Sequence, residues 1–328
     1  DLWSVAIMLH ELGAFYSAEL AGAEPTLKPP RAQYPEFVRA QMDMLAGPEG
    51  EQHWEYWKKR LAGELPELNL LTDRPRPATQ TFRGTLQFRM LSAELTQRLR
   101  EISSAQGVSL HAMLLAAFQV LLHRYTGQDD ILVGYPKANR GPRMATAVGY
   151  FVNPIIIRAD LSNDPPFSHF LREVHRLEQE AAEHDAYPLA LLVERLQPTR
   201  DVSRPPLFQA MFAWQKTTRL VNRAEMTAFA LGADGGQLAL GDDLRLESIP
   251  LEHQVSPFDL TLLMAESGDQ LAASLEYNSH LFFADTIRRM LGHFETLLES
   301  IVANPDQRLS KLALLTPAER QQILVDWN

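Results

Sequence analysis

The sequence contains no cysteine, and its basic side chains are outnumbered by acidic ones. The absence of cysteine excludes disulfides, thiolate metal sites and cysteine nucleophiles, and it fits a reducing compartment, so we expect a cytoplasmic location. With 31 Lys and Arg against 41 Asp and Glu, the formal net charge is -10. Because phosphate binding needs clustered basic residues, no nucleic-acid partner is expected.

Long apolar runs and glycine-rich phosphate loops are also missing. No run is long enough to cross a bilayer, and no glycine-rich loop follows a predicted strand, so neither membrane nor nucleotide binding is supported. His10 and Glu11 lack the zinc-binding HExxH spacing, and no Ser–His–Asp triad is apparent, so no metal site is predicted. The 328 residues, 45% hydrophobic and 22% charged, indicate a globular chain with one large or two smaller cores.

The first twenty residues predict an amphipathic helix. Asp1 is suited to be its N-cap, and apolar residues recur on one face at Leu2, Val5, Leu9, Leu12 and Tyr16. Since a natural chain seldom begins at a bare cap, we expect a further segment of the same site upstream.

The remaining patterns predict alternating helices and strands. Helices are expected over residues 35–61, 92–107, 109–127, 166–183, 187–196 and 284–303. Strands are expected over 85–90, 131–135, 148–161 with an interruption at Pro154, 207–214, 244–249, 258–265 and 270–277. The stretch 72–84 is predicted to be an extended connector between lobes. The fold class is therefore α/β, an α+β sandwich with helices on one side of a mixed sheet.

Five sequence blocks resemble condensation domains of nonribosomal peptide synthetases, in that family's order. Asp1-Leu2-Trp3-Ser4 resembles the end of the HHxxxDG motif, and Tyr34, Glu36 and Phe37 resemble YxDF. Residues 148–154, with Arg158, resemble the GxFVN strand, 184–189 a degraded HQDxPF block, and 200–209 the RDxSRNPLFQ block. Leu2 replaces the usual glycine, and Ala186 replaces the acidic residue of its block.

This resemblance implies lobes of the chloramphenicol-acetyltransferase-like fold, arranged as a V-shaped pseudo-dimer around a tunnel. Residues 1–45 would be the C-terminal remnant of the first lobe, 46–84 the connector, 85–311 the second lobe, and 312–328 the start of a linker toward an adenylation domain. Most of the first lobe would then lie outside this chain. So would the two motif histidines, and these 328 residues alone are expected to be inactive.

The implied activity is amide-bond formation in a modular peptide, or hybrid polyketide–peptide, synthetase. A donor acyl thioester on an upstream carrier domain would be transferred to an aminoacyl acceptor on a downstream carrier domain. The carriers would bring phosphopantetheine, and the chain itself would bind no cofactor. Two alternatives stay open: a catalytically silent platform that recruits other proteins, and a cyclisation-type relative. Residues upstream of Asp1 would distinguish them.

The resemblance also selects site residues. Asp1 would cap the helix and form a salt bridge that holds the histidine loop, rather than act as a general base. Tunnel or substrate candidates are Leu2, Trp3, Tyr150, Asn153, His184, Trp214 and Ser256, although helix packing is favoured for Trp3. Asn153 could instead bond its own backbone as a turn residue. Flanked by Glu183 and Asp185, His184 has poor geometry for a metal because successive residues point apart. Arg200, Asp201 and Arg204 are predicted to be structural supports.

Overall fold

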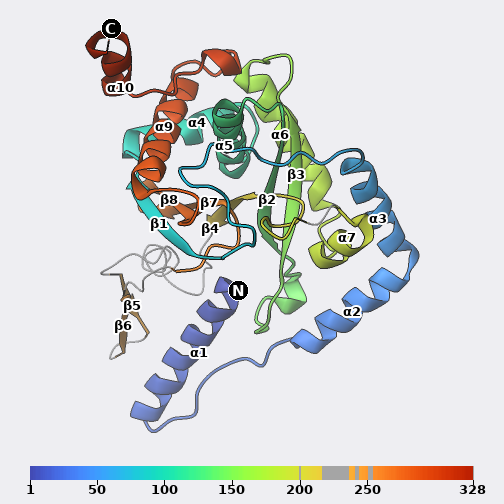
Figure 1. Ribbon diagram of the computed structural model, residues 1–328. Helices are drawn as coiled ribbons and strands as arrows, with labels where there is room; N and C mark the ends of the chain where they lie inside the picture. The colour runs from blue at the N-terminus through green and yellow to red at the C-terminus, as the bar shows by residue number, and fades with distance from the viewer. Residues whose placement is uncertain (199–200, 216–235, 241–243, 250–253, 328) are drawn as a thin grey trace.

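The computed structural model describes residues 1–198, 201–215, 236–240, 244–249 and 254–327 (Figure 1). Its longer helices are α1 (Leu2–Leu20), α2 (Tyr34–Ala46), α3 (Pro48–Arg60), α4 (Ala93–Ala105), α5 (Leu110–Thr126), α6 (Phe167–Ala182), α7 (Leu189–Leu196) and α9 (Ala284–Ala303). Short helical turns lie at Pro142–Met144, Leu309–Lys311, α10 (Pro317–Gln321) and Gln322–Asp326.

A six-stranded mixed sheet with the order β1-β8-β7-β4-β2-β3 forms the centre of the molecule. Its strands are β1 (Gly84–Met90), β2 (Asp130–Ala138), β3 (Val152–Asp160), β4 (Ala210–Gln215), β7 (Leu260–Ser267) and β8 (Gln270–Asn278). β4 runs parallel to β2 and β7, whereas the outer pairings are antiparallel. A separate hairpin joins β5 (Gln237–Ala239) to β6 (Arg245–Glu247). The mixed α/β class predicted from the sequence is confirmed.

Helix α5 is the centre of the helical layer, with α4 and α9 to one side of it and α6 to the other (Figure 1). Ser109 caps the helix by accepting the Ala112 N–H at 3.0 Å, and Gly127 ends it in the left-handed conformation. Every residue from 112 to 122 is buried, because other elements surround the helix. This agrees with the predicted apolar helix over 109–127.

The predicted helix over 35–61 is wrong, since the structure has two helices there. α2 ends at Ala46 and α3 begins at Pro48, with Gly47 extended between them. Proline restricts the preceding residue to extended conformations and suits the first turn of a new helix. The Gly47–Pro48 pair therefore turns the chain so that α3 can pack beside α7.

The helix predicted over the first twenty residues is present as α1, but its apolar face is only partly covered, by contacts of Leu2 and Leu9. Val5, Leu12 and Tyr16 are exposed, whereas Ser4, Ala6, Ile7 and Gly13 are buried. The small residues allow close approach: a Cβ on Gly13 would lie 3.1 Å from the Cβ of Leu240. Close packing of backbone against the hairpin region thus outweighs the apolar pattern in orienting this helix.

The strand predicted over 148–161 starts later and is continuous through Pro154. β3 begins at Val152, and Pro154 lies opposite Pro136 of β2. β3 is an edge strand, and β2 pairs with β4 only at Val133 and Gly134. Neither proline therefore removes a ladder hydrogen bond from a central position.

Within the described residues, no single helix has the length and apolar character to cross a membrane. α4 and α5 meet such a test only together, as a pair bent by 106°.

Candidate functional site

A buried carboxylate connects three parts of the chain at the start of α1. One oxygen of Asp1 accepts the Ser4 N–H at 2.8 Å, which caps the helix, and the other accepts the Phe151 N–H at 3.2 Å. The guanidinium of Arg140 donates to the same carboxylate at 3.1 Å. The side chain of Asp1 is only 5% exposed, and that of Arg140 only 1%. The carboxylate therefore holds the helix, the loop after β2 and the entry to β3 together.

Arg140 extends this contact into a network. It donates to the Ser4 hydroxyl at 2.5 Å and to the carbonyls of Met144 and Ala147 at 3.0 and 2.6 Å. Its guanidinium also lies 4.0 Å from the Phe151 ring centre, a cation–π distance. Burial lowers the pKa of Arg140 from its usual value. The Asp1 carboxylate nearby supplies the opposite charge, which favours the cation.

Ser4 completes the contact on the helix side. Its hydroxyl donates to the Gly149 carbonyl at 2.7 Å and accepts the Gly149 N–H at 3.1 Å. We call Asp1, Ser4, Arg140, Gly149 and Phe151 the Asp1–Arg140 junction. It brings residues 1–4, the first block of the sequence resemblance, into contact with residues 148–154, the third block.

Aromatic packing adds the second block to the junction. A Cβ on Gly149 would lie 2.3 Å from the ring of Tyr34, so the close contact of α2 requires glycine there. The Tyr34 and Phe37 rings lie 5.2 and 4.9 Å from the ring of Phe151. Beside them is a cavity of about 410 Å³, the α2 cavity, lined by Phe37, Ala40, Gln41, Met44, residues 138–141, Asp185 and Ala186.

Asn153 fastens the loop between α6 and α7 to the start of β3. Its side-chain N–H groups donate to the carbonyls of Asp185 and Tyr187 at 2.9 and 2.7 Å. Its oxygen accepts the Leu189 N–H at 2.9 Å. The observed bonds support a backbone-bonding role, although with the loop rather than with its own turn; a tunnel-lining role stays a prediction.

We expect Asn153→Ala to lower the free energy of unfolding by about 2–3 kcal/mol. Three hydrogen bonds of about 1 kcal/mol each are lost, and the partly buried Tyr187 carbonyl and Leu189 N–H lose this partner. Urea unfolding of both proteins measures the difference. A change below about 0.5 kcal/mol, combined with a loss of turnover in the parent protein, would instead favour the tunnel.

The other tunnel candidates lie in different surroundings. Leu2 packs beside Leu238 and Leu240. The Trp3 indole N–H donates to the Ala145 carbonyl at 3.1 Å, as expected for a packing residue. Tyr150 is 62% exposed, next to the junction.

Trp214 and Ser256 lie away from the junction. The indole N–H of Trp214 is buried and has no hydrogen-bond partner among the described residues. Ser256 is fully buried, and its hydroxyl donates to the Phe258 carbonyl at 2.7 Å. Ser256 thus packs within its own loop in the described structure, and a tunnel-lining role stays a prediction.

His184 contacts His53 and the ring of Tyr56. The described residues contain no group of three or more His, Asp or Glu that could hold a metal.

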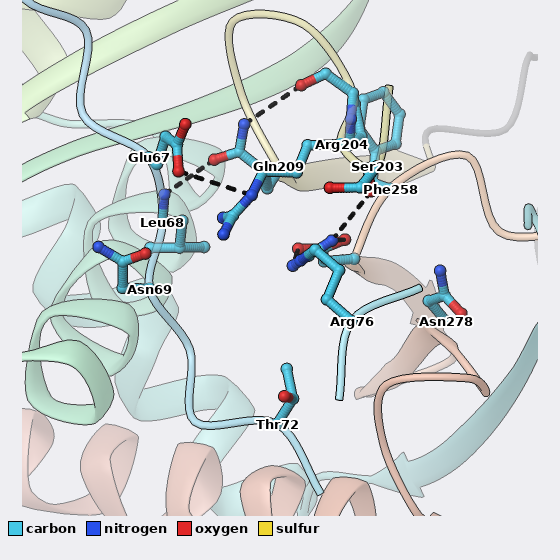
Figure 2. A network of polar contacts seen from close by, with 12 residues as sticks. Glu67, Leu68, Asn69, Thr72, Arg76, Ser203, Arg204, Gln209, Phe258 and Asn278 are labelled. Carbon is cyan, nitrogen blue, oxygen red and sulfur yellow. Dashed lines mark hydrogen bonds and ion pairs between the residues drawn. The ribbon is translucent and has the colours of Figure 1, made fainter. Parts of the chain in front are cut away.

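The loop that resembles RDxSRNPLFQ forms a second polar network (Figure 2). Gln209 accepts the Leu68 N–H at 2.8 Å and donates to the Pro205 carbonyl at 3.2 Å. Arg76 donates to the Ser203 carbonyl and forms a buried ion pair with Asp259. These contacts hold in place the segments that lead into β4 and β7.

Of the three predicted supports, two can be placed. An oxygen of Asp201 accepts the Ser203 N–H at 2.8 Å, and Arg204 lies 3.3 Å from Asp201 and 3.5 Å from Glu67. Arg200 lies outside the described residues.

We expect Asp201→Asn to cost about 1 kcal/mol or less, because the carboxylate is 42% exposed and solvent screens its ion pair. Hydrogen bonds from Ser203 lower the pKa of Asp201. A carboxyl with a depressed folded-state pKa stabilises the fold above its usual value of 3.8, and this contribution is lost as the pH falls through the folded-state pKa. Urea unfolding of both proteins at pH 7 and pH 3 should therefore give a smaller difference at pH 3, and an equal difference would contradict the assignment.

Comparison with known proteins gives consistent similarities. The family model described as "Condensation domain" matches residues 1–324. One of the linear gramicidin synthase proteins of Brevibacillus parabrevis is 40% identical over 330 residues, which is 100% of this chain and 6% of that protein. The chain thus spans only a small part of this much longer relative.

Solved structures agree in fold. A four-domain nonribosomal peptide synthetase, crystallised in its holo form with AMP and glycine, matches with a TM-score of 0.83 and 25% identity over 97% of this chain and 24% of that one. The X-domain from teicoplanin biosynthesis matches with a TM-score of 0.80 and 26% identity over 96% of this chain and 69% of that one.

Proposed function

Because the chain belongs to the condensation-domain family, we propose that it forms part of the site where a modular peptide synthetase joins a donor acyl group to an acceptor amine. The observation that carries the proposal is the Asp1–Arg140 junction. It brings residues that resemble the end of one family motif together with residues of the block that resembles another, at a buried ion pair. A carboxylate held in this way can fix the segment that precedes it.

The proposed reaction transfers the donor acyl group from its thioester to the amine of the carrier-bound acceptor. The acceptor amine attacks the donor carbonyl, the new C–N bond forms, and the C–S bond to the donor carrier breaks. The amine loses a proton, and the donor thiolate takes one up. An α-amino group has a pKa of about 8, so a sizeable fraction is nucleophilic at neutral pH. Orientation of tethered reactants can contribute about 7 kcal/mol or more, so the protein's main task is to hold them together.

Asp1 is a positioning residue in this proposal rather than the base. Its carboxylate is 5% exposed and accepts hydrogen bonds from Ser4, Phe151 and Arg140. A buried carboxylate whose oxygens already accept from a cation and from N–H donors has little access to a substrate. Proton transfer would therefore fall to another group.

The proposed partners are a donor carrier domain, an acceptor carrier domain and an adjoining adenylation domain. Phosphopantetheine arms would come with the carriers as part of the substrates. Family membership and the length of the relative support this assignment. We also propose that the 328 residues alone do not form the amide, since they contain the motif's Asp1 but no histidines before it.

Reconstitution tests this proposal. Donor and acceptor carriers are loaded, and the parent protein or the 328-residue chain is added; mass spectrometry of the acceptor carrier then reports amide formation. We expect product with the parent and none with the chain. Product at equal rates would contradict the proposed need for the motif histidines. No product with the parent, but stable binding of another protein, would favour the platform alternative.

A further inference from the structure

Two imidazoles face each other where α3 meets the loop between α6 and α7. His53, on α3, is 7% exposed, and its Nδ1 lies 2.9 Å from Nδ1 of His184. A neutral imidazole has one N–H and one acceptor nitrogen. A bond between two Nδ1 atoms therefore requires opposite tautomers: one ring carries hydrogen on Nδ1, and the other carries it on Nε2.

The surroundings assign these tautomers. Nε2 of His53 is buried without a hydrogen-bond partner among the described residues, and Glu49 is the carboxylate closest to it, at 3.8 Å. A carboxylate oxygen at this distance favours an N–H over a lone pair at Nε2, so His53 carries its hydrogen on Nε2 and its Nδ1 accepts the Nδ1–H of His184. His184 is only half-buried, so its Nε2 can accept a hydrogen bond from solvent. An added proton can then enter at Nε2 of His184 without breaking the bond between the two Nδ1 atoms.

The second protonation is different, because both Nδ1 atoms would then be donors. Two cationic rings with N–H groups directed at each other across 2.9 Å lose the hydrogen bond and repel. The Tyr56 ring, stacked on His184 at 4.0 Å, favours a single cation but leaves this conflict in place. Glu49 of α3 and Glu183 are the carboxylates that act on the two imidazoles. Arg60 of α3, with Arg176 and Glu180 of α6, acts on the Tyr56 ring beside them, and Lys137 of β2 pairs with Asp185, the residue after His184.

The loop held by this pair forms part of the candidate site. The His184 carbonyl accepts the Trp57 indole N–H at 3.0 Å, which adds a second bond to α3. The next residue, Asp185, accepts from Asn139 and Asn153 through its carbonyl and pairs with Lys137 through its carboxylate at 2.9 Å. Asp185 and Ala186 also line the α2 cavity.

We propose that His53 and His184 form a proton-sharing latch that holds residues 183–188 against α3 and opens when both rings are protonated. Opening would free the carbonyls that orient Asn153 and remove one wall of the α2 cavity. The latch is independent of the proposed function, since it concerns the fold of this chain alone. It makes the loop sensitive to acid near the range where histidine titrates.

The closed loop is expected to lose stability as the pH falls. Burial, and then the neighbouring His53, lower the pKa of His184 from its usual 6.5, against the effect of Glu183. The open loop therefore binds a proton at a higher pH than the closed loop does. The contribution of His184 to the stability of the closed loop is therefore complete above about pH 6.5. It decreases as the pH falls, and the decrease ends once the pH is below the pKa that His184 has in the closed loop.

Two measurements on the unmodified chain test the latch. With ¹⁵N-labelled histidine at pH 8, long-range ¹H–¹⁵N NMR should show His53 as the Nε2–H tautomer and His184 as the Nδ1–H tautomer. Hydrogen exchange, corrected for its intrinsic pH dependence, should show protection of residues 183–188 falling between pH 7.5 and 5, by about tenfold for each unit of pKa shift. Identical tautomers, or unchanged protection, would overturn the proposal.

Variants separate the latch from general acid sensitivity. His184→Gln should remove most of the pH dependence of protection in the loop. His10→Gln changes an exposed histidine and should leave it unchanged. Equal pH dependence in His184→Gln and the unmodified chain would overturn the proposal. If His184→Gln does not fold, the tautomer measurement decides alone.

Discussion

Replacing Arg140 with methionine is expected to lower the free energy of unfolding by about 3–5 kcal/mol. The change leaves the Asp1 carboxylate, 5% exposed, without its cation. Removing one partner of a buried ion pair is costly because the remaining charge stays desolvated. Methionine keeps much of the side-chain volume, so the loss reports charge and hydrogen bonding more than packing. Denaturant unfolding of the 328-residue chain gives the value.

Arg143→Met is the matched control in the same loop. Arg143 is 76% exposed and lies 3.7 Å from Glu36, so its replacement should change stability by about 0.5 kcal/mol or less. Adding Asp1→Asn to Arg140→Met should recover part of the loss, since the unpaired charge is removed. Equal effects of the two arginine replacements would show that the junction does not hold the fold together.

The second large effect is expected at Arg76. Its partner Asp259 is 3% exposed, and both guanidinium ends donate to the carboxylate. Arg76→Met should therefore lower the free energy of unfolding by about 3–5 kcal/mol. The replacement leaves the buried Asp259 carboxylate, between the 201–209 loop and β7, without its cation (Figure 2).

Arg288→Met tests whether burial causes that cost. Arg288 pairs with Asp285, but the two side chains are 61% and 84% exposed. We expect almost no change in the urea midpoint for this variant. A similar loss in both variants would mean that the Arg76 effect comes from lost packing or from changes in the unfolded chain.

Elements with local signals could be predicted from the sequence. α9 was predicted over 284–303 and has those bounds, and α5 lies between the cap and the glycine that predict it. Such elements depend on caps and periodicity within a few turns. The Gly47–Pro48 break is local too, and a proline signal could have found it.

Features that depend on contacts between distant segments could not be predicted in this way. The face that α1 buries is set by packing against Leu240, which local periodicity does not contain. Arg140 lies 139 positions from Asp1, and nothing near either residue indicates the pairing. The same holds for His53 and His184, 131 positions apart. The family resemblance selected Asp1 and Asn153, but only the fold reveals their partners.

The most direct test of the positioning role of Asp1 is the transfer rate of the parent protein with Asp1→Asn, normalised to its folded fraction. Asparagine keeps the cap and the shape but removes the charge that pairs with Arg140. We predict amide formation by the unmodified parent, and a variant that is less stable but loses less than about tenfold in rate per folded molecule. General-base loss would cost about 10²–10⁴-fold. A parent that forms no amide, or a variant with unchanged Tm and abolished transfer, would contradict the proposed function and this role of Asp1.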